Sequence, residues 1–189
     1  MGHDAWSCDV LPTEVDGPHI QGDVLPHLSD GWDLMIAHPP CTHLAVSGAR
    51  YFAQKRADGR QQAALQFVQQ LLDAPIFRIA LENPVSIIST HIRKPDQIIQ
   101  PWEYGHPESK KTCLWLNNLN RLNPTDILPT PDGGKWSNQT PSGQNKLAPS
   151  PDRWKKRSMT YQNIADAMAS QWGRASKLKT STPRAMPYL

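Results

Sequence analysis

The feature that most constrains this chain is a short apolar run that ends in two prolines and a cysteine. Residues 34–37 are too few for a helix and have the length of a buried strand. Pro39 and Pro40 cannot donate hydrogen bonds to a neighbouring strand, so the strand must end before them. Cys41 therefore lies on a stiff loop just beyond the carboxyl end of a predicted strand.

The position of Cys41 admits two interpretations. Ligands in open α/β sheets bind beyond the carboxyl ends of the strands, and a thiol held on a rigid loop there is a candidate nucleophile. The alternative is that Cys41 is a small buried apolar residue, as free cysteines commonly are. Cys41 taken alone favours burial, so the choice depends on the rest of the chain.

Other apolar patterns predict the remaining elements. Residues 58–72 carry apolar side chains at three- and four-residue steps, which predicts a helix capped by Asp58 and ended before Pro75. The other predicted elements are strands at 4–10, 19–25, 76–81 and 111–116, a helical turn at 25–28, a short helix within 85–92, a loop at 94–106 and a helix at about 161–172. Residues 117–157 are rich in Pro and Gly and predict an irregular insertion.

The order of these elements predicts an α/β fold. Strands that alternate with helices form a sheet with helices packed on both of its faces. Four chemically active side chains, Asp9, Asp23, Cys41 and Glu82, fall at the ends of predicted strands. We therefore expect these side chains to meet at one edge of the sheet.

Composition and charge bear on the number of domains, the kind of partner and the cellular location of the chain. Its 189 residues suit one domain at 1–173, followed by a flexible basic tail at 174–189. Residues 151–189 carry eight Lys and Arg against two Asp and Glu, which suggests a polyanionic partner or a solvated tail. Three widely spaced cysteines and the lack of a signal peptide or long apolar run predict a cytoplasmic protein.

The motifs together resemble the cytosine-5 DNA methyltransferase family in its short phage or bacterial form. Glu82 and Asn83 follow Cys41 at a distance of 41 positions, as that family's Glu-Asn element follows its Pro-Cys. The resemblance covers most of residues 4–173, and its further matches are Gly22-Asp23, Asp33, Pro40, Ser47-Gly48, the basic strand at 110–116 and the helix start at Gln162-Asn163.

The resemblance implies a Rossmann-like methyltransferase sheet and a role for each matched residue. It implies that Cys41 is the nucleophile, Glu82 the acid and Asn83 a positioning residue. It implies that the cofactor is S-adenosylmethionine, held by Asp9, Asp23, Pro39 and Asn163. It implies that the partner is DNA with a flipped or single-stranded cytosine, contacted by Ser47, Lys110 and Lys111.

The chain departs from the family at its start. The family begins with a strand and a glycine-rich loop that contacts the cofactor, whereas this chain begins at the following strand. We expect that an upstream segment or a partner completes the site, or that cofactor binding is weak or lost. The alternative function is a catalytically degenerate, methyltransferase-like protein that binds nucleic acid.

Other chemistries compete for the same residues. His38, Cys41 and His43, with Cys113 or His106, would suit zinc, but the signature of zinc deaminases is incomplete, so no metal is expected. His38-Pro39-Pro40 partly resembles amino-group methyltransferases, in which an aromatic residue stands where this chain has cysteine. Three further features are open to both a nucleic-acid contact and a structural role: Trp102, Tyr104 and the basic run at 155–157.

Overall fold

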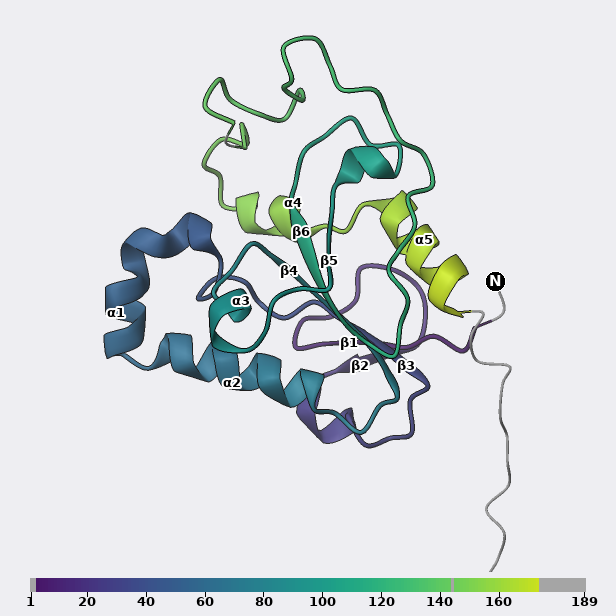
Figure 1. The fold of residues 1–189 in the computed structure, drawn as a ribbon. Coiled ribbons are helices and arrows are strands. Elements are labelled where there is room, and N and C mark those ends of the chain that lie inside the picture. Colours follow the sequence, from purple (N-terminus) through teal and green to yellow (C-terminus); the bar gives the residue numbers. More distant parts are fainter. Residues whose placement is uncertain (1–2, 144, 174–189) are drawn as a thin grey trace, which may run out of the picture.

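The computed structural model describes residues 3–143 and 145–173. Its centre is a mixed sheet of four strands in the order β3-β4-β6-β5 (Figure 1). β3 (Leu34–Ala37) is parallel to β4 (Arg78–Pro84), β4 is antiparallel to β6 (Thr112–Asn117), and β6 is antiparallel to β5 (Gln97–Ile99). The fold is therefore α/β, as the alternation of elements predicts.

Helices cover both faces of the central sheet. α2 (Arg60–Leu72) packs Leu65, Val68 and Leu71 against one face, together with α3 (Ile88–His91). α5 (Gln162–Trp172) packs Ile164, Met168 and Trp172 against the other face, and Figure 1 shows α2 and α5 on opposite sides of the sheet. Successive residues of β6 alternate between these two clusters, because side chains alternate across a strand.

A second sheet stands apart from the first. β1 (Ser7–Asp9) and β2 (His19–Gln21) pair in parallel and form no ladder with the central sheet. The expectation of one continuous sheet is therefore wrong, and the strand expected at 4–10 is only three residues long. None of the residues 3–23 is buried, so this pair lacks the two covered faces that parallel strands usually have.

The segment after Cys41 is more ordered than the sequence predicts. A 3₁₀ helix, η2 (Val46–Tyr51), leads into α1 (Phe52–Ala57), and neither was expected. The helix expected from residue 58 begins at Arg60, because Gly59 with φ of 78° breaks the chain between α1 and α2. Asp58 lies one residue before the N-cap residue Gly59; its carboxylate accepts the Arg60 N–H at 3.2 Å and forms an ion pair with the Arg60 side chain.

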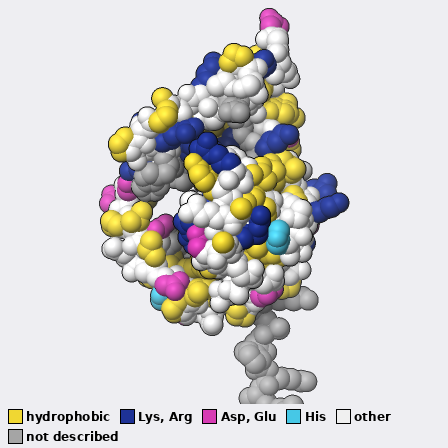
Figure 2. Space-filling model, turned by 90° about the vertical axis from the view of Figure 1, so that its left-hand side faces the viewer, with side chains coloured by type: hydrophobic (Ala, Val, Ile, Leu, Met, Phe, Trp, Pro, Cys, Tyr) yellow, Lys and Arg dark blue, Asp and Glu magenta, His cyan; other side chains and the backbone are white. Residues whose placement is uncertain are grey.

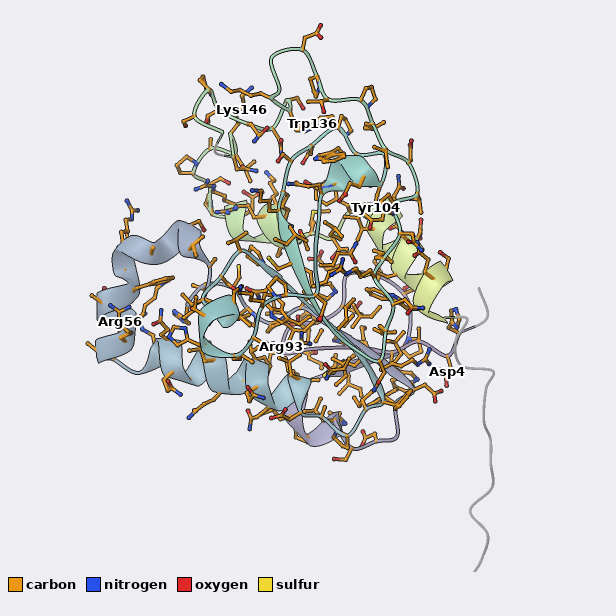
Figure 3. The ribbon with its side chains drawn as sticks, viewed as in Figure 1. Asp4, Arg56, Arg93, Tyr104, Trp136 and Lys146 are labelled. Atoms are coloured by element: carbon orange, nitrogen blue, oxygen red, sulfur yellow. The ribbon has the colours of Figure 1, made fainter. Side chains whose placement is uncertain are left out.

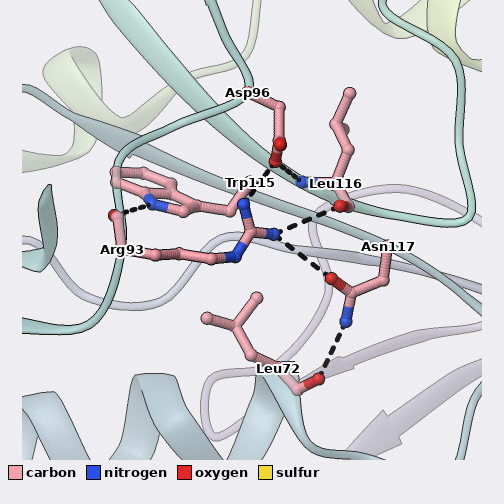
Figure 4. Close-up of polar contacts among 6 residues, drawn as sticks. All are labelled: Leu72, Arg93, Asp96, Trp115, Leu116 and Asn117. Atoms are coloured by element: carbon pink, nitrogen blue, oxygen red, sulfur yellow. Dashed lines mark hydrogen bonds and ion pairs between the residues drawn. The ribbon is translucent and has the colours of Figure 1, made fainter.

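The segment expected to be a loop at 94–106 contains β5 and the 3₁₀ helix η3 (Pro101–Glu103). A polar network fixes the start of this segment to β6 (Figure 4). The Arg93 guanidinium donates to Asp96 at 2.6 Å and to the Leu116 carbonyl at 3.1 Å, and Asp96 accepts the Leu116 N–H at 2.7 Å. β5 was missed because three residues are too few to show a hydrophobic period.

The irregular insertion is confirmed for most of its length. The described residues between β6 and α4 (Arg153–Ser158) contain no helix or strand, only isolated bridges. α4 itself was not expected. The 3₁₀ helix η1 (Leu25–His27) is the predicted helical turn, and the predicted tail at 174–189 lies outside the described residues. No helix in the described part of the chain is long and apolar enough to cross a membrane.

Candidate active site

Cys41 is exposed, on the loop that leaves β3. Its carbonyl oxygen accepts the N–H groups of Leu44 and Ala45 at 3.0 and 2.9 Å, so a tight turn follows the cysteine at once. The interpretation of Cys41 as a buried apolar residue is therefore wrong. The structure instead presents the thiol on a closed turn beyond the carboxyl end of a strand.

Glu82 lies on the neighbouring strand, near the same end. β3 and β4 pair in register with Ala37 opposite Leu81, so the next residues, His38 and Glu82, are neighbours. The His38 Nδ1 atom lies 3.3 Å from the Glu82 Oε2 atom, with 42% and 20% of the two side chains exposed. Glu82 is thus accessible and has a polar partner in His38.

Asn83 ties the two strands together. Its side chain is 1% exposed, and its Nδ2 atom donates to the Pro39 carbonyl at 2.9 Å. Its Oδ1 atom is buried and has no hydrogen-bond partner among the described residues. The positioning role expected for Asn83 therefore has a physical basis: it joins the strand of Glu82 to the proline loop of Cys41.

Backbone pairing adds to this tie. The Val46 N–H donates to the Val85 carbonyl at 3.0 Å, the Ile87 N–H donates to the Leu44 carbonyl at 3.1 Å, and Ala45 bridges Ser86. The segment that follows Cys41 is thus held along the segment that follows Glu82. Cys41 thus lies on the loop that Asn83 joins to the strand of Glu82, and the three residues expected to be catalytic lie toward the same end of β3 and β4.

β6, which pairs with β4, places the positively charged Lys111 near the end of the sheet that carries Glu82. Burial is the main reason that the pKa of the Cys113 thiol is raised; the Glu82 carboxylate raises it further and Lys111 lowers it. Cys113 is only 2% exposed and belongs to the apolar cluster under α2. The pairing of β4 with β6 brings Lys111, which is exposed, to the same end of the sheet as Glu82.

Lys110 points elsewhere. Its Nζ atom donates to the Met159 carbonyl at 3.4 Å and lies 5.6 Å from the centroid of the Tyr161 ring. The Tyr161 hydroxyl in turn donates to Glu108, and burial together with that carboxylate raises the pKa of Tyr161. Lys110 therefore contacts the segment between α4 and α5, so Lys111 is the freer of the two predicted lysines. Ser47, the other expected substrate contact, is exposed on η2.

The two carboxylates expected to hold the cofactor lie together at the ends of β1 and β2. Asp9 accepts the Leu11 N–H at 2.8 Å, and Asp23 accepts the Leu25 N–H at 3.0 Å. The Gly22 N–H donates to the Asp9 carbonyl at 2.9 Å, which brings Asp9 beside the residue before Asp23. Burial raises the pKa of the Cys8 thiol, and both carboxylates raise it further. Paired exposed carboxylates suit hydroxyl and amino donors, so their chemistry fits a nucleoside.

The remaining predicted cofactor residues are Pro39 and Asn163. Pro39 is buried at the end of β3, and its carbonyl is the one that Asn83 holds. The Asn163 Nδ2 atom donates to the Tyr104 carbonyl at 2.8 Å, which fixes the start of α5 against the turn after η3. Since the other end of α5 contacts Arg78 at the start of β4, Asn163 lies toward the end of the sheet that carries Glu82.

The aromatic residues of the segment after β5 belong to the core. Tyr104 is fully buried, and Trp102 stacks on Trp136 with ring centroids 6.2 Å apart and planes 8° from parallel. Trp136 is only 8% exposed, and Figure 3 shows how it lies above Tyr104 in the upper part of the molecule. Of the two roles considered for Trp102 and Tyr104, the structure supports packing at an edge of the core.

The basic run on α4 is partly paired within the chain. Lys155 contacts Glu14, and Lys156 lies 2.7 Å from Asp152, while Arg157 is exposed. Figure 2 shows Lys and Arg side chains gathered on the face that α1 and α4 share. Two of the three cations of this run thus have acidic partners within the chain.

Two surface cavities lie away from these residues. One, of about 690 Å³, lies beside α2 and η1, and the other, of about 540 Å³, lies beside residues 94–98. Neither is lined by a predicted site residue. In the described part of the chain no three metal-binding side chains gather as a metal site would need, so the zinc alternative has no support from geometry.

Comparison with protein-family models, with curated proteins and with solved structures found no match. Any function must therefore be argued from the geometry of the site and the chemistry of its residues.

Sequence reasoning missed two buried polar residues behind the site, Lys55 and Gln61. They are 8% and 3% exposed and donate to the carbonyls of Thr42 and His43. Lysine and glutamine are both usually exposed. No pattern in the sequence marks them, because their burial depends on how α1 and α2 return to the loop of Cys41.

Proposed function

We propose that this chain is an S-adenosylmethionine-dependent methyltransferase that acts on carbon 5 of cytosine in DNA, with Cys41 as nucleophile. The main support is that an exposed thiol on the loop after β3 and a partly exposed carboxyl group on β4 lie toward the same end of two adjacent parallel strands, where the buried Asn83 amide donates to the loop. A thiol and a carboxyl group at one pyrimidine ring are the two groups that this reaction needs.

Each group has a defined task in the proposed reaction. The Cys41 thiolate adds to carbon 6 of cytosine, which forms an S–C bond and makes carbon 5 nucleophilic. Glu82 donates a hydrogen bond or proton to ring nitrogen 3, and this stabilises the charge that builds up there. After carbon 5 gains the methyl group, it loses its proton, the S–C bond breaks and the thiolate leaves.

The cofactor would be held by the β1–β2 pair and the end of β3. S-adenosylmethionine supplies the electrophilic methyl group. Asp9 would accept from ribose hydroxyl groups, Asp23 from the adenine amino group, and Pro39 and Asn163 would complete the contact surface. Among the described residues β3 pairs with β4 alone, so its other edge is the one at which a further strand with its glycine-rich loop would have to pair.

The target cytosine must be accessible to Cys41. A base inside a duplex is stacked, so the substrate is a flipped or single-stranded cytosine. Lys111 lies at the edge of the sheet near Glu82, and Ser47 is exposed on the segment that follows Cys41. These two residues are the proposed contacts to the nucleotide, with Lys110 in a supporting position.

A second candidate function is binding of nucleic acid without catalysis. The observation that favours it is the exposed state of the β1–β2 pair, where the cofactor would have to bind. A chain of this kind would retain the basic face of Figure 2 and bind DNA, but transfer no methyl group.

Transfer of a labelled methyl group separates the two functions. The chain is incubated with S-adenosylmethionine labelled in its methyl group and with single-stranded or duplex DNA, and the bases are analysed. The proposal predicts labelled 5-methylcytosine that is absent with Cys41→Ser. DNA binding without any labelled base, also in a version with an added N-terminal strand and glycine-rich loop, would support the second function.

A further inference from the structure

We infer that Lys55 and Gln61 are positioning residues that hold the loop of Cys41 in its reactive shape. Their side chains come from α1 and α2 and reach two successive carbonyl groups of the loop, those of Thr42 and His43. The inference rests on the proposed function in one respect: only if Cys41 forms an adduct with cytosine does the rate of that step depend on the shape of the loop. The contacts themselves can be tested separately.

Lys55 is the stronger of the two contacts. Its Nζ atom donates to the Thr42 carbonyl at 2.5 Å, and only 8% of the residue is exposed. No carboxylate of the described chain lies within ion-pair distance of it; the rings of Tyr51 and Phe52 lie 5.9 and 6.0 Å away. An ammonium group withdrawn from water without an acidic partner is unfavourable, so this lysine is a poor choice for stability alone.

The ammonium group lies beside η2 as well as beside the turn at Cys41. A methyl group added at Gly48 would lie 3.5 Å from Lys55 Nζ, which is ordinary packing contact. Gly48 belongs to η2, the segment that leads away from Cys41. Lys55 is therefore positioned between that segment and the Thr42 carbonyl to which it donates.

Gln61 supports the next residue of the loop. It is 3% exposed, and its Nε2 atom donates to the His43 carbonyl at 3.4 Å. Together with the turn at Cys41 and the pairing of Leu44 with Ile87, the two side chains provide a donor for each carbonyl from residue 41 to residue 44.

The result is a loop with a fixed backbone and a free thiol. The Pro39 carbonyl is held by Asn83, the carbonyls of residues 41–44 are held as described, and Cys41 itself remains exposed. Fixing a nucleophile before its partner arrives avoids ordering it during the reaction, and a shift of about 1 Å is able to lower a rate by roughly 100-fold.

The test compares Lys55→Met with Arg56→Met. Both changes remove one positive charge from α1, but Arg56 is exposed at the outer side of that helix (Figure 3). The first readout is the rate at which Cys41 forms an adduct with an oligonucleotide that contains 5-fluorocytosine, in the presence of S-adenosylmethionine. The second is amide hydrogen exchange at Leu44 and Ala45, whose N–H groups donate to Cys41. Thermal unfolding of each variant is followed in parallel.

The inference predicts that the adduct rate and the amide exchange change in Lys55→Met while the chain stays folded. Lys55→Met should slow adduct formation by roughly 10- to 100-fold and speed exchange at Leu44 and Ala45, with the folded state retained. Lys55→Gln, which keeps a donor, should restore part of the rate, and Arg56→Met should change the rate less than about twofold. A rate for Lys55→Met equal to that of Arg56→Met would overturn the inference.

Two further outcomes are also decisive. If Lys55→Met does not fold, Gln61→Leu is measured in its place, and an unchanged adduct rate there overturns the inference. If the wild-type chain forms no adduct, the proposed function fails, and the contacts are then judged by exchange alone. In that case faster exchange at Leu44 and Ala45 supports the loop contacts, and unchanged exchange overturns them.

Discussion

The side chains around Cys41 differ in burial according to what they do. Asn83, Lys55 and Gln61 are buried and donate to loop carbonyls, whereas Cys41 and Glu82 keep accessible atoms. A buried N–H group that loses its acceptor is unfavourable, so these side chains stabilise the loop in the backbone conformation that offers them carbonyl groups. The exposed groups remain available to a ligand.

Replacing the Glu82 carboxyl group tests its proposed role as acid. Glu82→Gln should lower methyl transfer by about 10²–10⁴-fold, the usual effect of removing a general acid, while DNA affinity stays within about twofold. The measurement is the rate of methyl transfer at saturating DNA, together with a binding titration. Full activity in Glu82→Gln would remove Glu82 from the mechanism.

The pH dependence of stability should contain a contribution from His43. Burial lowers the pKa of His43, and the charges of Lys55 and Arg60 lower it further. The unfolded chain then binds a proton more readily than the folded one, so the free energy of unfolding should fall as the pH drops below about 6.5.

Denaturant unfolding between pH 7.5 and 5 measures this contribution. His43→Gln should reduce the slope of stability against pH in that window, because the titrating group is gone. A variant at the exposed His91 provides the control. An identical slope in wild type and His43→Gln would show that His43 is not held neutral in the folded state.

Among the elements, those with strong local signals were predicted well. β3 has the predicted bounds of residues 34–37, because two prolines follow its short apolar run. α5 begins one residue from the expected start. That Cys41, Glu82 and Asn83 lie toward the same end of β3 and β4 was also predictable, since adjacent parallel strands end at the same edge.

Elements that depend on distant partners were missed or misplaced. β5 is short and exists through its pairing with β6, and β4 runs on through Glu82 to Pro84 because β6 continues to pair with it. α1 was missed because its buried residue is Lys55, which no apolar pattern reveals. The bond between His38 and Glu82 joins residues 44 positions apart.

The network of Figure 4 should determine how firmly β5 is attached to the sheet. Arg93→Met removes donors to Asp96, to the Leu116 carbonyl and to the Asn117 side chain, and should lower the free energy of unfolding by about 1–3 kcal/mol. Denaturant unfolding measures the change. Lys94→Met, the neighbouring exposed lysine, is the control; a loss of equal size there would show that charge rather than the network is responsible.

In the molecule as a whole, the two sheets should differ in stability. β4 and β6 contribute fully buried residues to both clusters, whereas residues 3–23 contribute none. A pair of strands alone is marginal in water. Amides of β1 and β2 should therefore exchange by local opening, with protection well below that of β4 and β6.

Hydrogen exchange followed by mass spectrometry measures this difference directly. If S-adenosylmethionine binds between the β1–β2 pair and the end of β3, adding it should raise the protection of residues 7–9 and 19–21. Equal protection of both sheets without any ligand would contradict the description of the β1–β2 pair as a weakly held unit.

The most direct test of the central proposal is the mass of the chain after incubation with S-adenosylmethionine and an oligonucleotide that contains 5-fluorocytosine. Fluorine at carbon 5 cannot leave as the proton does, so the S–C bond to carbon 6 should persist. We predict an adduct at Cys41 in the wild type and in Cys8→Ser, and none in Cys41→Ser. An adduct that survives Cys41→Ser would contradict the proposed role of Cys41.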